Sequence, residues 1–323
     1  MQKFLIQYER PRSTICQFLT LLDRVSFSEA CKSFYQNFTF EDISGFKPIE
    51  SRINSGACGI VDKVVRIRDN KIFAWKKICL VHENIKPEEI VKSIQNEYNL
   101  LLRMLDQPNI LQLEELLVNT KDATAVIVTE YCDGGDLFDV ILDCYNRKCG
   151  APENFIWMIA YDMLRALKAC HAYGIIHNDV KTENILLNKK HDFSQENDYP
   201  TFTLCDFGVA VAIPSNNYTI RVKTLNGTPQ YASPEKRMGY AFNEKADIWS
   251  LGCVLYELCQ YQKAFPSDTS IHRLSNQERI NICTKIDIKY SGYLQQFIWA
   301  LLTFDMNKRP SAEEAFRTVS VIM

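Results

Sequence analysis

Residues 175–184 read Ile-Ile-His-Asn-Asp-Val-Lys-Thr-Glu-Asn. The apolar pair at the start indicates that the chain is leaving a buried strand. Groups that carry charge or donate hydrogen bonds are then crowded together, at His177, Asp179, Lys181 and Asn184. Neither an amphipathic helix nor a half-buried strand has this pattern. We therefore expect a loop on the lip of a cleft, backed by the apolar run 185–187.

The composition is that of an ordinary globular enzyme, with 46% apolar and 24% charged residues among 323. A net charge of -2 argues against a nucleic-acid or anionic-membrane role driven by a basic surface. No apolar run is long enough for a membrane-spanning helix, so we expect no membrane insertion. The 12 cysteines form no Cys-x-x-Cys pair, which favours a reduced intracellular setting, cytoplasmic and/or nuclear. We expect no signal peptide, because the first ten residues break into charge after three apolar ones.

Two domains are expected. Residues 1–46 read as short helices that form an extension, and residues 47–323 as the main domain. An alternative for the extension is an F-box-like adaptor, suggested by Leu-Leu-Asp followed by Ser-Glu-Ala-Cys-Lys-Ser-Phe. Removing the extension and testing the remainder would separate these two interpretations.

The main domain begins with three expected strands between residues 48 and 80, followed by a helix at about 88–104. Lys76 lies in the third strand, where a lysine is costly unless it is paired. Glu97 falls on the apolar face of the helix with Ile90, Ile94 and Leu101, and it needs a partner too. We predict that Lys76 and Glu97 pair. The alternative, in which both side chains reach solvent separately, requires two misplaced charges.

Further motifs follow in order. After strands near 112–118 and 124–130, residues 129–137 read Thr-Glu-Tyr-Cys-Asp-Gly-Gly-Asp-Leu, which would also suit a plain linker between domains. A helix is expected over 152–173, and a polar, exposed insertion over 188–200. A strand at 201–205 ends in Asp206-Phe207-Gly208. Later come Gly227–Glu235 and Asp247 at the start of a hydrophobic helix, where a buried carboxylate can accept backbone N–H groups from the loop at 175–184. Arg309 is suited to pairing with Glu235.

This ordered series resembles protein kinases. The stretch 175–184 is similar to their catalytic loop, His-Arg-Asp-x-Lys-x-x-Asn, with Asn178 in place of Arg. Residues 54–61 resemble the glycine-rich loop of kinases, with Asn54 in place of the first Gly. Residues 227–235 resemble the kinase segment that ends in Ala-Pro-Glu, with Ser233 in place of Ala. The presence of Lys181 and Thr228 is similar to the pattern of serine/threonine kinases. The motifs around 231–235 and 248–259 resemble those of NIMA-related kinases.

The resemblance implies an α+β, two-lobed protein kinase fold. The small lobe would hold a five-stranded antiparallel sheet and one helix, and the larger lobe would be mainly helical. It implies ATP and Mg²⁺ as cofactors and a protein substrate with a Ser or Thr hydroxyl. ATP would be bound by Ile53, Asn54, Ser55, Gly56, Ala57, Cys58, Gly59, Val61, Ala74, Lys76, Thr129, Glu130, Cys132, Asp136, Asn184 and Asp206.

The resemblance also implies the chemical roles. Asp179 would accept the proton of the substrate hydroxyl, and Lys181 would neutralise the moving phosphoryl group. Lys76, held by Glu97, would orient the α- and β-phosphates, while Asn184 and Asp206 would bind Mg²⁺. His177 and Phe207 are expected to support the loop by packing. The alternative is a pseudokinase, suggested by Asn54, Asn178 and Ser233, although none of these departures removes a phosphate or metal ligand.

Overall fold

The computed structural model describes residues 43–56, 59–80, 87–119, 124–190, 193, 199–213, 219–220, 227–265 and 286–323. Of these, residues 43–103 and 112–131 form one compact unit, and residues 104–111 with 132–323 form another. The expected helical extension lies outside the described residues except for its last four, 43–46. In the part that is described, no helix is long and apolar enough to cross a membrane.

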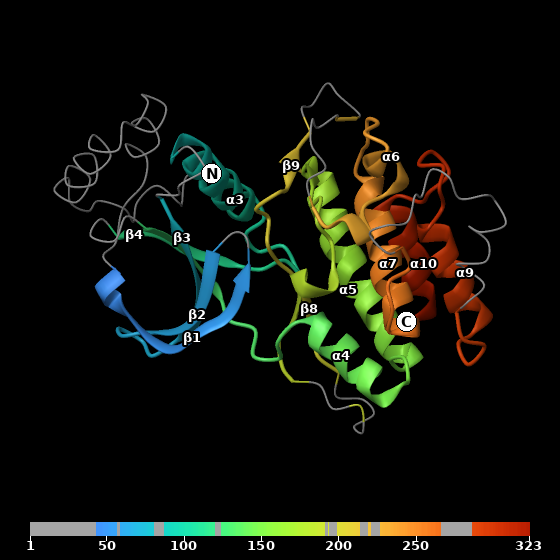
Figure 1. Cartoon of the computed structure of the whole chain (residues 1–323), viewed down its shortest axis with the longest axis horizontal. Coiled ribbons are helices and arrows are strands. Elements are labelled where there is room, and N and C mark those ends of the chain that lie inside the picture. The colour runs from blue at the N-terminus through green and yellow to red at the C-terminus, as the bar shows by residue number, and fades with distance from the viewer. Residues whose placement is uncertain are drawn as a thin grey trace. The chain divides into compact units, whose positions relative to one another are not determined.

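The first unit, the sheet unit, is an antiparallel sheet with one helix. A 3-10 turn, η1 (Ile43–Gly45), precedes five strands in the order β1-β2-β3-β5-β4, and α3 contacts β4 (Figure 1). The elements are β1 (Phe46–Gly56), β2 (Gly59–Arg66), β3 (Ile72–Cys79), α3 (Pro87–Arg103), β4 (Leu113–Asn119) and β5 (Thr124–Glu130). The strands and the helix expected from the sequence are all present.

Alternation along the strands separates an apolar face of this sheet from the face that carries Ala74 and Lys76. The apolar face carries a buried cluster of Phe46, Val64, Phe73, Trp75, Leu117, Val126 and Val128. Trp75 also donates from Nε1 to Asp62 at 2.9 Å, which satisfies its buried polar atom. Because neighbouring side chains point to opposite faces, Ala74 and Lys76 lie on the other side of the sheet.

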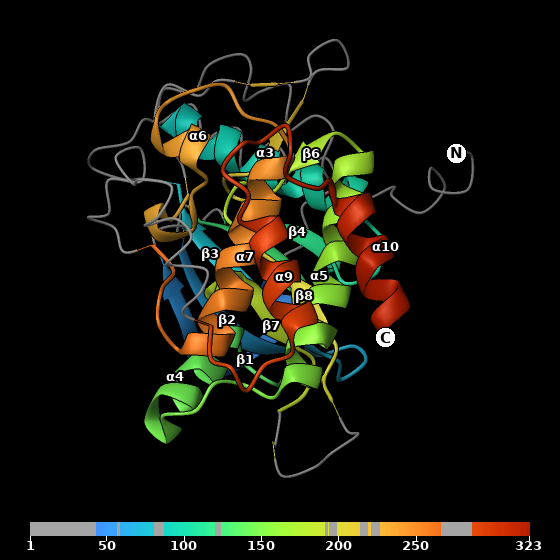
Figure 2. The same cartoon turned by 90° about the vertical axis from the view of Figure 1, so that its right-hand side faces the viewer.

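The second unit, the helical unit, is built around α5 (Glu153–Ala172), which is buried along most of its length. Helices α7 (Lys245–Gln260) and α10 (Ala312–Ile322) pack against α5, and α9 (Gly292–Leu301) packs against α7 (Figure 2). The remaining elements are α4 (Leu137–Arg147), β6 (Ile175–Ile176), η2 (Thr182–Asn184), β7 (Ile185–Leu187), β8 (Phe202–Leu204), β9 (Val211–Ala212), η3 (Pro229–Tyr231) and α6 (Pro234–Arg237). Together the two units confirm the expected α+β class.

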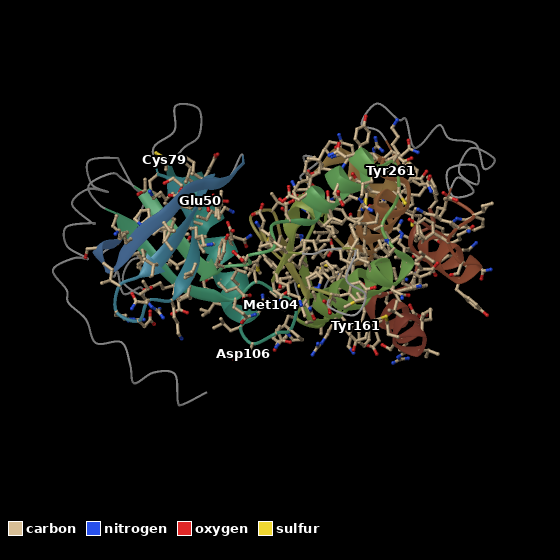
Figure 3. All side chains as sticks on the ribbon, turned by 90° about the horizontal axis from the view of Figure 1, so that it is seen from below. Glu50, Cys79, Met104, Asp106, Tyr161 and Tyr261 are labelled. Atoms are coloured by element: carbon tan, nitrogen blue, oxygen red, sulfur yellow. The ribbon has the colours of Figure 1, made fainter. Side chains whose placement is uncertain are left out.

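Side chains fill the interior of the helical unit, with Tyr161 and Tyr261 at its opposite ends (Figure 3). The predicted exposed insertion at 188–200 is confirmed at Asn188 and Lys190, which are exposed, but it is wrong at Phe193 and Tyr199, which are half-buried. The rings of Phe193 and Tyr199 lie 5.1 and 6.3 Å from that of Phe155, which is fully buried on α5. Two aromatic residues within an otherwise polar stretch had enough apolar area to bind to the helix.

Candidate functional site

The loop after β6 is held through its backbone by one buried carboxylate. Asp247, 1% exposed in the first turn of α7, accepts hydrogen bonds from the N–H groups of His177 and Asn178 at 2.9 and 2.8 Å. Nε2 of His171 on α5 lies 2.9 Å from the same carboxylate. Burial acts to raise the pKa of Asp247, but His171, His177 and the N–H of Asn178 together outweigh it, so the pKa is lowered. The predicted contact between Asp247 and the loop is confirmed.

Asp179 lies at the centre of the loop with polar groups on each side. Thr228 N donates to its Oδ1 at 2.7 Å, and Asn184 Nδ2 donates to its Oδ2 at 3.2 Å and to its main-chain oxygen at 2.8 Å. Lys181 Nζ lies 3.1 Å from Asp179 Oδ2 and donates to Thr228 Oγ1 at 3.2 Å. The carboxylate is therefore fixed in one orientation beside an ammonium group.

Lys181 keeps its proton in this setting. Burial alone lowers the pKa of an ammonium, but the carboxylates of Asp179, Glu183 and Asp206 outweigh that effect, so the pKa of Lys181 is raised. The lysine can therefore carry positive charge to an anion at neutral pH.

Strand pairing brings Asn184 and Asp206 to the same end of a small sheet. Asn184 precedes β7, Asp206 follows β8, and the two strands are antiparallel with Ile185 opposite Leu204. The N–H of Cys205 donates to the carbonyl of Asn184 at 3.0 Å, which fixes this approach. Asp206 itself has a left-handed backbone, with φ of 61°.

The oxygen atoms at this end suit Mg²⁺. The amide nitrogen of Asn184 is occupied by Asp179, so the amide oxygen is the atom that it offers to a cation. Asp206 adds a carboxylate, and Mg²⁺ prefers such oxygen ligands with substrate phosphates and waters completing its shell. Within the described ranges, no group of three or more His, Cys, Asp or Glu side chains forms an all-protein metal site.

His177 supports the loop by packing, as predicted. Its side chain is fully buried, its ring lies 4.8 Å from that of Phe207, and its Nε2 is 2.9 Å from the carbonyl of Cys205. These contacts connect the loop to the Asp206 segment.

In the sheet unit, one face gathers four of the predicted residues. Cross-strand partners share a face, and Val61 pairs with Lys76 while Ala74 pairs with Thr129. Lys76 Nζ lies 2.8 and 3.0 Å from the two carboxylate oxygens of Glu97, which is only 5% exposed on α3. The predicted ion pair is confirmed.

The residues expected to form the phosphate-binding loop lie at a β-hairpin. Asn54, Ser55 and Gly56 at the end of β1 pair with Val61, Ile60 and Gly59 of β2, and Ile53 precedes them. Ala57 and Cys58 are outside the described residues. Gly59 has φ of 138°, and a Cβ there would come 2.3 Å from the carbonyl oxygen of Lys77, so this position requires glycine.

The segment after β5 carries the other predicted nucleotide ligands. Thr129 is buried, and the N–H of Glu130 donates to the carbonyl of Gln112 at 3.0 Å. Cys132 is half-buried. Asp136 has a structural contact that the sequence analysis missed, because its Oδ1 accepts from Asp139 N at 3.2 Å and caps α4. Burial, followed by the charge of Asp139, raises the pKa of Asp136 to about 6.

The predicted pair of Glu235 and Arg309 is confirmed. Arg309 is 1% exposed, and its two terminal nitrogens donate to the two carboxylate oxygens of Glu235 at 2.8 and 3.1 Å. Arg309 also donates to the carbonyls of Thr303 and Lys245. This two-point contact fixes the start of α6.

A buried network beside the loop was not foreseen. Tyr231 donates its hydroxyl to Glu257 Oε2 at 2.6 Å, Thr182 Oγ1 lies 2.9 Å from the same hydroxyl, and Lys263 pairs with Glu257 at 2.7 Å. These polar residues stand singly in the sequence, and no period or spacing connects them. Only the packing of η2, η3 and α7 brings them together.

Comparison with known proteins gives a family match over most of the chain. The model of the protein kinase domain matches residues 48–319. Serine/threonine-protein kinase Nek2 of Mus musculus is 34% identical over 267 residues, covering 81% of this chain and 57% of that protein. A probable serine/threonine-protein kinase nek2 of Dictyostelium discoideum is 30% identical over 265 residues, covering 81% and 59%.

A third relative, the G2-specific protein kinase nimA of Emericella nidulans, is 29% identical over 297 residues, covering 83% of this chain and 40% of that protein. The chain thus spans less than three-fifths of the length of each of these curated relatives. The similarity is to NIMA-related serine/threonine kinases.

Proposed function

Because this chain belongs to the protein kinase domain family, we propose that it transfers the γ-phosphoryl group of ATP to Ser or Thr hydroxyls of a protein. The observation that supports this most directly is the fixed group of Asp179, Lys181 and Asn184, with Asp206 brought beside Asn184 by strand pairing. Phosphoryl transfer depends on alignment and charge neutralisation more than on covalent help, and this arrangement supplies both.

Each residue has a role that its contacts support. Asp179 accepts the hydrogen bond of the substrate hydroxyl and takes its proton, since its own orientation is already fixed. Lys181, which stays charged, neutralises the transferred group. In the sheet unit, Lys76 is held by Glu97 and is suited to the α- and β-phosphates. Bound Mg²⁺ would offset phosphate charge, and Asn184 and Asp206 would hold it.

The remaining nucleotide contacts are proposals of the same kind. Main-chain groups of Glu130 and Cys132 would bind adenine, and Asp136 would accept from the ribose. The hairpin at 53–61 would cover the phosphates, because glycine at 59 lets backbone N–H groups approach them. The pseudokinase alternative has no support from the relatives, which are named as kinases. An intracellular location, cytoplasmic and/or nuclear, stays a prediction.

The test is turnover of ATP on a mixed Ser/Thr peptide library, with Asp206→Asn as the matched variant. We expect Asn to keep the size of the side chain but to lower kcat by about 100-fold or more, because a full charge at the metal is lost. Thermal melting should be unchanged. Near-wild-type turnover of a correctly folded Asp206→Asn protein would contradict the metal assignment, and an inactive wild type would contradict the proposed function.

A further inference from the structure

A lysine is buried directly behind the catalytic loop. Lys236, the third residue of α6, is 7% exposed, and its Nζ donates to the carbonyl oxygen of Asn178 at 3.0 Å. The same ammonium lies 5.4 Å from the centre of the Phe242 ring. A buried ammonium is costly unless negative charge or hydrogen bonds compensate it. Its position therefore needs an explanation beyond packing.

Negative charge surrounds this ammonium on several elements. Burial, the largest influence, lowers the pKa of Lys236, while Asp247 of α7, Asp179 of the loop and Glu235 of α6 act in the opposite direction. The pairing of Glu235 with Arg309 anchors α6 beside the loop. Burial prevails, so the pKa of Lys236 is lowered, and its side chain is held in the same helix turn as a buried ion pair.

The peptide that Lys236 binds is the one directly before the base. Asn178 has φ of 71°, a left-handed conformation that Asn adopts more readily than most residues. Its N–H is bound by Asp247, and its Nδ2 donates to the carbonyl of Val209 at 3.0 Å. With Lys236 on the carbonyl, main-chain and side-chain groups of this residue are held by three different elements.

Close packing shows that little room exists for this peptide to move. Gly227 has φ of 91°, and a Cβ at this position would come 2.5 Å from the carbonyl oxygen of Asn178 and 3.2 Å from Asp179 Oδ1. The carbonyl is therefore confined by Lys236 and by the chain at Gly227. Rotation of the 178–179 peptide would carry Asp179 out of its present orientation.

We propose that Lys236 is a positioning residue for phosphoryl transfer, holding Asp179 in place through the carbonyl of Asn178. The proposal rests on the proposed function. Lys181 lies beside the carboxylate of Asp179 itself, whereas Lys236 acts on the peptide that precedes it. Alignment of Asp179 is thus part of the fold.

The experiment compares Lys236→Met with Lys236→Arg in the full chain. Met fills similar space without charge or donors, and we expect kcat to fall roughly 10- to 100-fold with both KM values nearly unchanged, because a small misplacement of the base is costly. Arg restores the charge and the donors, and should recover most of the rate. The matched control is Lys168→Met, which removes a half-buried lysine of α5 that pairs with Glu313.

Backbone hydrogen exchange supplies a readout that needs no turnover. In Lys236→Met we expect amides of residues 177–182 to exchange faster, while those of α5 and α7 keep their protection. Unchanged kcat and exchange in this variant would overturn the proposal. Faster exchange throughout the helical unit, with no recovery by Arg, would overturn it too, because the lysine would then be merely structural. If the wild type is inactive, the proposed function fails, and the exchange comparison alone decides whether Lys236 holds the loop.

Discussion

The catalytic loop of the helical unit and the Lys76–Glu97 pair of the sheet unit are fixed in different ways. The loop is held through its backbone, with the N–H groups of His177 and Asn178 bound to a carboxylate that is 1% exposed. The pair joins two long side chains, and the side chain of Lys76 is 17% exposed. A backbone held by a buried acceptor has one geometry, whereas two flexible side chains can separate without unfolding anything. The position of Asp179 is therefore set by the fold, and that of Lys76 by an adjustable contact.

Replacing Asp247 should give the largest effect, because it removes the buried acceptor that holds the backbone of the loop. Asp247→Ala leaves two buried N–H groups and His171 without their acceptor, and we expect the free energy of unfolding to fall by roughly 3–5 kcal/mol with turnover lost. Denaturant unfolding followed by circular dichroism measures this. Asp247→Asn, which keeps one acceptor oxygen, should lie between the wild type and Asp247→Ala. Wild-type stability of Asp247→Ala would show that the loop does not depend on this carboxylate.

Replacing Glu97 should separate activity from stability on the adjustable side. In Glu97→Gln the charge that holds Lys76 is gone, and we expect kcat/KM for ATP to fall by about 10- to 100-fold. The free energy of unfolding should change by only about 1–2 kcal/mol, since Gln still accepts a hydrogen bond. Steady-state kinetics at varied ATP concentration measures the first quantity. Glu89→Gln, an exposed acid on the same helix, is the control, and equal losses in both variants would argue against a specific role for the pair.

The smallest effect is expected at Asp136, which combines a structural contact with a proposed ligand role. The pKa of its carboxyl is raised to about 6, above the ordinary value of about 3.9, so the folded state binds the proton more tightly than the unfolded state. Its contribution to stability is full at low pH and is lost as the pH rises through 6. Between pH 5 and pH 7 the free energy of unfolding of the wild type should therefore fall by roughly 1 kcal/mol more than that of Asp136→Asn.

Asn caps a helix about as well as Asp, so the substitution keeps the contact to Asp139 N while removing the titration. Unfolding by denaturant at both pH values tests the difference between the two proteins. Parallel pH dependence in wild type and variant would place the titrating group elsewhere.

Much of this structure was predictable because a few charged residues occupy positions where the apolar periodicity of a strand or helix calls for a buried side chain. Lys76 in an apolar strand and Glu97 on the apolar face of a helix each demanded a partner, and that demand identified the pair. Asp247 at the start of a hydrophobic helix was predicted from the same reasoning, and Arg309 from the Arg-Pro pair that follows Phe304-Asp305. The cap at Asp136 was missed, although an Asp before the apolar start of a helix is a recognised signal.

Other features have no local signal. Lys236 follows a Pro-Glu pair in a turn of helix only four residues long, and nothing nearby in the sequence shows that its side chain is buried. The network of Tyr231, Glu257 and Lys263 depends on how η3 and α7 pack. The left-handed backbone of Asn178 depends on the groups that bind this residue. In each case tertiary contacts decide the outcome, and a single sequence does not display them.

The pairing of Glu235 with Arg309 also affects the order in which parts of the helical unit can fold during synthesis. The two residues are 74 positions apart, and both are almost wholly removed from water in the finished unit. While the chain is still being synthesised, Glu235 has left the ribosome long before its partner exists, and an unpaired buried carboxylate is strongly unfavourable. The turn of helix behind the catalytic loop therefore cannot reach its final packing until Arg309 emerges. A chain truncated before residue 309 should accordingly lack the fixed start of α6, even where the other helices of this unit have formed.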